Sequence, residues 1–68
     1  MSLSIRRQAL RKKRGYSRYT IWMGSGEPVS FEMPSPPRPQ TTKWQVMFAE
    51  RLARALQDWA CANFWKED

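Results

Sequence analysis

Seven cationic side chains lie close together near the N-terminus, and they are the residues of this sequence most suited to a specific chemistry. They are Arg6, Arg7, Arg11, Lys12, Lys13, Arg14 and Arg18. Clustered lysines and arginines neutralise phosphates, and aromatic side chains beside them can stack on exposed bases. With Tyr16 and Trp22 among them, the seven cations predict a nucleic-acid-binding segment.

The positive charge of the chain is confined to this segment. The 68 residues contain 12 Lys and Arg against 6 Asp and Glu, a formal net charge of +6. Residues 1–18 hold seven of those cations and no acid, so the other fifty residues carry a net charge of −1. The same segment would suit an acidic protein surface or a membrane surface, or it could simply be a solubilising tail.

The residue inventory argues against catalysis. The sequence has no His, a single Cys, and in Gly24-Ser25-Gly26 a glycine pair without the Lys-Ser/Thr of a phosphate loop. We therefore expect no catalytic residue, no metal site, no cofactor and no small-molecule substrate. The lone Cys61 favours a reducing, cytoplasmic compartment, and no apolar run is long enough to predict a membrane span.

The C-terminal third predicts one long amphipathic helix, from about residue 43 to 65. Its apolar residues recur at helical spacing and form one stripe: Trp44, Phe48, Leu52, Ala55, Leu56, Trp59 and Ala62. Thr42 followed by Gln45 has the form of a capping box, which predicts the start of the helix. We expect Leu52 and Trp59 to be buried.

Residues 17–33 predict a β-hairpin with its turn at 24–28. Pairing Met23 with Val29 would place Ile21 opposite Phe31 and Tyr19 opposite Met33. One face would then be wholly apolar, and the other would carry Arg18, Thr20, Trp22, Ser30 and Glu32.

The remaining segments complete an α+β prediction. Residues 1–15 form a basic arm that we expect to be disordered or marginally helical, because its cations repel one another and its apolar residues form no stripe. The run PSPPRPQT at 34–41 predicts a stiff, extended, proline-rich connector. Residues 16–68 would then be a single small hairpin-plus-helix domain.

The predicted helix is longer than the predicted strands. It would measure about 34 Å at 1.5 Å per residue, whereas strands of five to seven residues span about 17–23 Å. Part of its apolar surface should therefore meet a protein partner or a second copy of the chain. The candidate contacts are Trp44, Met47, Phe64 and Trp65.

Two functions remain open. The first is a small, basic, non-enzymatic protein that binds nucleic acid through phosphate contacts of the N-terminal arm. The alternative is a protein-interaction module, such as an adaptor, inhibitor or assembly subunit, that docks its Trp- and Met-rich helix on a larger protein machine.

Overall fold

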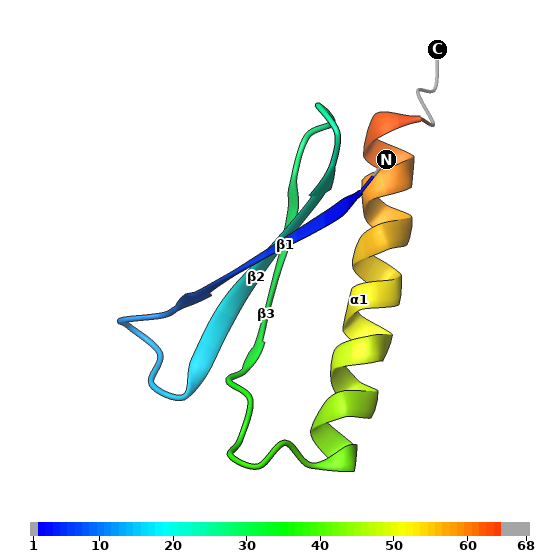
Figure 1. Cartoon of the computed structure of the whole chain (residues 1–68). Coiled ribbons are helices and arrows are strands. Elements are labelled where there is room, and N and C mark those ends of the chain that lie inside the picture. The colour runs from blue at the N-terminus through cyan, green and yellow to red at the C-terminus, as the bar shows by residue number, and fades with distance from the viewer. Residues whose placement is uncertain (1, 65–68) are drawn as a thin grey trace.

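Three antiparallel strands followed by one helix build the part of the chain that the structure, a computed structural model, describes: residues 2–64. The elements are β1 (Leu3–Ala9), β2 (Tyr16–Met23), β3 (Val29–Pro34) and α1 (Thr42–Asn63). The strands form one sheet in the order β1-β2-β3, and α1 runs beside it (Figure 1). The α+β prediction is confirmed.

The N-terminal segment is a strand, so the prediction of a disordered or marginally helical arm was wrong. Residues 3–9 pair with β2 along their whole length, from Leu3 opposite Met23 to Ala9 opposite Ser17. Without β1, one edge of β2 would lack a partner for its backbone groups. The strand also separates Arg6 from Arg7, because successive side chains point to opposite faces of a sheet.

The predicted hairpin exists, but its register differs from the prediction by two residues. Tyr19 lies opposite Phe31 and Ile21 opposite Val29, so the pairing of Met23 with Val29 was wrong. A shift of two residues keeps every side chain on its predicted face. The end of β2 pairs with β1 instead, which leaves a longer connection to β3, with Gly24 at a φ of 57°.

The helix begins with a cap one residue earlier than predicted. The side chain of Thr41, not Thr42, accepts a hydrogen bond from the backbone N–H of Trp44 at 3.1 Å. The Thr41 backbone carbonyl accepts from the N–H of Gln45 at 3.0 Å, so this residue closes the first turn. The last helical residue is Asn63, and the predicted end at Trp65 lies outside the described residues.

The core lies between α1 and the strands β2 and β3, and β1 stays beyond the cover of the helix. Its buried apolar side chains are Tyr19, Ile21, Met33, Trp44, Ala55 and Trp59. Leu52 is half-buried rather than buried, whereas the burial of Trp59 is confirmed. Phe48 joins the core through rings centred 5.2 Å from Trp44 and 5.1 Å from Tyr19.

Hydrogen bonds from the end of β3 and from the β2–β3 connection support the two ends of the long helix. At its start, the indole N–H of Trp44 donates to the carbonyl of Pro34 at 2.8 Å. At its end, the Asn63 side chain accepts from the N–H of Glu27 at 2.9 Å and donates to the Glu27 carbonyl at 3.3 Å. The helix is therefore held at its start by the end of β3 and at its end by the β2–β3 connection.

Candidate nucleic-acid interface

The sheet has one face that α1 does not cover, and two of the predicted cations lie on it. Strand alternation and register place the following residues there: Ser4, Arg6 and Gln8 from β1; Tyr16, Arg18, Thr20 and Trp22 from β2; Ser30 and Glu32 from β3. We call this surface the open face. Arg6 lies opposite Thr20 and Arg18 opposite Gln8, so the two arginines are diagonal neighbours, about 7–8 Å apart at Cα.

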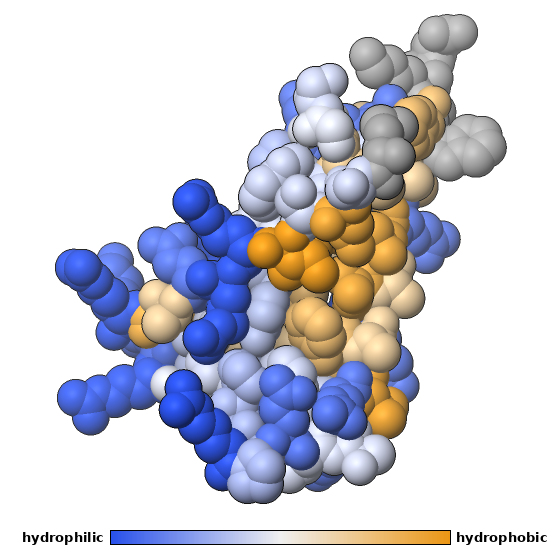
Figure 2. All heavy atoms as spheres, in the orientation of Figure 1, coloured by the Kyte–Doolittle hydropathy of each residue, from blue (hydrophilic) through white to orange (hydrophobic). Residues whose placement is uncertain are grey.

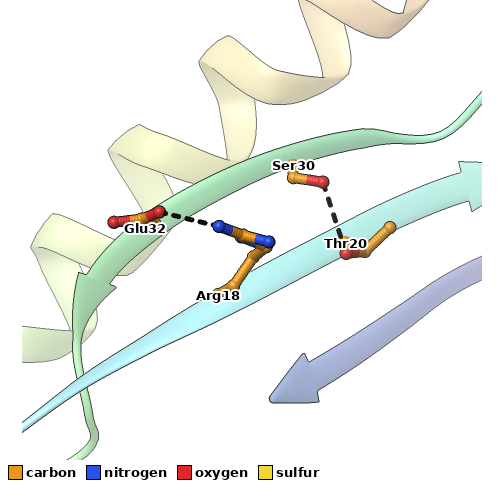
Figure 3. A network of polar contacts seen from close by, with 4 residues as sticks. All are labelled: Arg18, Thr20, Ser30 and Glu32. Carbon is orange, nitrogen blue, oxygen red and sulfur yellow. Dashed lines mark hydrogen bonds and ion pairs between the residues drawn. The ribbon is translucent and has the colours of Figure 1, made fainter. Parts of the chain in front are cut away.

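Polar contacts cross the open face between β2 and β3. Arg18 donates to Glu32 at 3.2 Å, and the hydroxyls of Thr20 and Ser30 lie 3.4 Å apart (Figure 3). The Arg18 and Glu32 side chains keep 50% and 41% of their surface exposed. An ion pair this exposed contributes about 0–1 kcal/mol, so an anionic ligand can compete with Glu32 for Arg18.

The four cations at positions 11–14 are carried by the ordered turn between β1 and β2. The N–H of Leu10 donates to the carbonyl of Tyr16 at 3.1 Å, and the N–H of Tyr16 donates to the carbonyl of Lys13 at 3.2 Å. Gly15 supplies the left-handed conformation that the turn needs, with φ at 78°. Its carbonyl accepts from the N–H of Ser35 at 2.8 Å, which fastens the turn to the connector.

Turn and open face meet at a hollow of about 280 Å³. It is lined by Leu10, Arg11, Lys12, Lys13, Arg18 and Glu32. Four cations therefore surround one opening, with a single carboxylate among them. Figure 2 shows the hydrophilic side chains gathered over the β1–β2 hairpin and the apolar ones gathered between sheet and helix. Within residues 2–64, the pair of Arg18 with Glu32 is the only ion pair.

The aromatic residues predicted for binding lie at the two ends of β2. Trp22 is half-buried opposite Ser4, and Tyr16 is half-buried beside the turn. The ammonium of Lys13 lies 4.1 Å from the centre of the Tyr16 ring, a cation–π contact. The open face thus offers one aromatic ring beside the cationic hollow and a second at the far end of β2.

Arg7 is separated from the other predicted binding residues. It lies opposite Tyr19 on the helix side of the sheet, where both residues line a groove of about 400 Å³ with Trp44 and Phe48. Burial raises the pKa of the Tyr19 hydroxyl above its ordinary value of 10.0, and the positive charge of Arg7 acts in the opposite direction. The Tyr19 hydroxyl is buried without a hydrogen-bond partner among the described residues.

Among the residues predicted to contact a protein partner, Trp44 and Met47 lie near the start of α1 and Phe64 lies at its end. Trp44 is a buried core residue, and Met47 packs against the same core. Phe64 is 65% exposed at the other end of the helix, with its ring 5.3 Å from that of Trp59. Trp65 lies outside the described residues.

Sequence reasoning missed the contribution of β1 to the site. Ser4 and Gln8 lie on the open face only because residues 3–9 are a strand. The sequence pattern that could have predicted this strand is the alternation of Ser2 and Ser4 with Leu3 and Ile5, because a period of two is typical of strands.

Comparison of the chain with protein-family models, curated proteins and solved structures finds no match. Over the part of the chain that the structure describes, no helix is long and apolar enough to cross a bilayer. Residues 2–64 likewise contain no grouping of acidic or cysteine side chains that could hold a metal ion.

Proposed function

We propose that the protein binds nucleic acid, without catalysis, through the β1–β2 hairpin. The observation that carries the proposal is the hollow where Arg11, Lys12 and Lys13 of the turn meet Arg18 of the open face. Cations that converge on one opening suit a ligand with closely spaced negative charges, and a phosphate backbone is such a ligand. The ordered turn supports the proposal, because it holds these side chains together before a ligand arrives.

The arrangement favours a single strand over a duplex. Tyr16 and Trp22 lie on the same face as Arg6 and Arg18, so a backbone along β2 would bring its bases over the two rings. Stacking on aromatic side chains contributes about 1–3 kcal/mol per base and needs unpaired bases. Gln8, Thr20 and Ser30 add uncharged hydrogen-bonding groups beside them.

The salt dependence of binding tests the phosphate contacts. Fluorescence anisotropy would measure the affinity for a random single-stranded oligonucleotide over a range of salt concentrations. Four single-strand phosphate contacts give a slope of log K against log salt of about −3. Replacing Arg11, Lys12, Lys13 and Arg14 together by Ala should remove most of that slope.

The chain offers a control with the same loss of charge. Replacing Arg38, Lys43, Arg51 and Arg54 by Ala also removes four cations, all exposed, but from the connector and the helix. This variant should keep most of the slope of the unmodified protein. If both variants lose the same part of the salt slope, binding depends only on the net charge of the protein and not on the hairpin. If the unmodified protein shows no detectable binding near physiological salt, the proposal is contradicted.

Trp22 gives a second test of the single-strand preference. Replacing Trp22 by Leu should weaken binding of a single strand about 5- to 160-fold, from the loss of stacking, and change duplex binding much less. The protein-interaction hypothesis predicts no effect on either. Deleting residues 1–14 would not separate the two hypotheses, because the deletion removes β1 and with it a third of the sheet.

A further inference from the structure

The outer edge of β1 presents backbone groups that no other strand within residues 2–64 uses. β1 is an edge strand of the sheet. Leu10, next to β1, donates its N–H to Tyr16 across the ladder at 3.1 Å. Hydrogen-bonded pairs alternate along an antiparallel ladder, so Gln8, Arg6 and Ser4 also direct their backbone groups toward β2. The odd-numbered residues Leu3, Ile5, Arg7 and Ala9 direct theirs outward.

The same residues expose apolar side chains. Leu3 and Ile5 lie on the sheet face that α1 covers over β2 and β3, but the helix does not reach across β1. They remain 39% and 45% exposed. An exposed edge with free backbone groups and apolar side chains is a template for pairing with another strand. Natural edge strands are usually protected by charges, and here Arg6 and Arg7 limit which strand can pair.

We propose that the occupant of this edge is β1 of a second copy, paired antiparallel about a two-fold axis at Ile5. In this register, Ile5 lies opposite Ile5 of the second copy, Leu3 opposite Arg7, and Ser4 opposite Arg6. No cation then lies directly opposite another cation. Three residues of each strand, Leu3, Ile5 and Arg7, can exchange backbone hydrogen bonds across the axis, because all three direct their groups outward.

The other symmetric registers are worse. An axis at Arg6 would place Arg6 opposite itself, and an axis at Arg7 would do the same for Arg7. Like charges directly opposite in a sheet are destabilising. An axis at Leu3 would shorten the paired segment and leave Arg7 outside it. An axis at Ser4 would also keep the cations apart, but it would pair only residues 3–5 of β1. The axis at Ile5 therefore gives the longest pairing of β1 without like charges opposite each other, and it covers Leu3 and Ile5 of both copies.

The pairing would join two three-stranded sheets into one sheet of six strands. Both helices would lie on one side of it, with Leu3 and Ile5 of the two copies in the gap between them. The two open faces would become continuous on the other side and would double the set of Arg6, Arg18 and Trp22. The two chains repel each other through their net charge of +6, so the dimer should strengthen as salt is added.

Disulfide trapping tests the register. Both variants carry Cys61→Ser, which removes the exposed natural thiol. Ile5→Cys should form a disulfide-linked dimer under mild oxidation, because paired Cα atoms lie about 5.5 Å apart. Ala9→Cys, on the same strand and face, would be about 26 Å from its counterpart, eight residues away at about 3.3 Å each. It should stay largely unlinked, and equal linkage of the two variants would overturn the register.

Sedimentation equilibrium without nucleic acid tests the dimer itself, so its outcome does not depend on the proposed function. The unmodified protein should show a monomer–dimer equilibrium at micromolar to millimolar concentrations that shifts toward dimer with added salt. Ile5→Lys should weaken the dimer at least about tenfold while circular dichroism shows an unchanged fold, since Ile5 lies outside the core. A monomer at every concentration, or a dimer broken by Phe64→Lys and not by Ile5→Lys, would overturn the proposal.

Discussion

Tyr19 combines favourable ring packing with an unfavourable polar atom. Its ring stacks on Phe31 at 5.4 Å, but its buried hydroxyl has no partner among residues 2–64. A buried polar group without a hydrogen bond costs free energy. We predict that Tyr19→Phe raises the free energy of unfolding by about 1 kcal/mol, measured by urea denaturation. Tyr16→Phe is the control, and a loss of stability in Tyr19→Phe would indicate that the hydroxyl is hydrogen-bonded in solution.

The same hydroxyl makes stability depend on alkaline pH. Burial raises the pKa of Tyr19 in the folded state above 10.0, so near this pH the folded chain holds a proton that the unfolded chain releases. Stability must then fall as the pH rises through and above 10. Urea denaturation at pH 8 and at pH 10.5 should show a smaller loss for Tyr19→Phe than for the unmodified protein. Equal losses would contradict this prediction.

Gly26 is needed for its lack of a side chain. A Cβ there would collide with the ring of Trp59 and lie 2.9 Å from the side-chain oxygen of Asn63. Gly26→Ala should therefore destabilise the fold by about 1–3 kcal/mol, visible as a lower melting temperature. Ser25→Ala, at the exposed neighbouring position, should have little effect. An unchanged melting temperature for Gly26→Ala would show that the end of α1 can shift to accommodate the methyl group without loss of stability.

At the scale of the elements, the cap of α1 distinguishes two adjacent threonines. Thr41→Ala removes the side chain that accepts from the N–H of Trp44 and should cost about 0.5–2 kcal/mol. Thr42→Ala removes an exposed side chain inside the first turn and should change stability by less than about 0.5 kcal/mol. Thermal denaturation of the two variants compares them directly, and the opposite order would assign the cap to Thr42.

The elements also show what the sequence could predict and what it could not. The helix and the apolar face of the hairpin follow from periodicity, because Trp44, Trp59, Tyr19 and Ile21 recur at the spacing of the buried side. Periodicity cannot fix a register that differs by two residues, since both registers bury the same side chains. The strand β1 was missed because its side chains are mostly exposed, and its pairing depends on the free edge of β2.

The candidate site was predicted as a set of residues and not as a surface. The cations and aromatic residues could be named from their types and spacing alone. Whether they converge depends on β1, which brings Arg6 onto the open face and sends Arg7 to the helix side. The sequence also did not indicate that Trp44 is buried in the core, with its indole N–H donating to the carbonyl of Pro34.

For the whole molecule, the concentration of charge on one hairpin should lower stability at low ionic strength. Seven cations lie within residues 6–18, and salt screens their mutual repulsion. We predict that the melting temperature rises between 10 mM and 200 mM NaCl, in the absence of nucleic acid. Replacing residues 11–14 by Ala should raise the melting temperature at low salt and reduce its salt dependence. If the replacement leaves the salt dependence of the melting temperature unchanged, the repulsion that lowers stability does not come from residues 11–14.

The order of the elements along the chain has a consequence for synthesis. Tyr19, Ile21 and Met33 belong to strands that leave the ribosome before α1, the helix that covers them. A nascent chain can form its hairpins while their apolar face is still in contact with solvent or with a chaperone. Because Trp59 and Asn63 lie near the end of α1, the native contacts of the β2–β3 connection form only once nearly the whole segment has emerged.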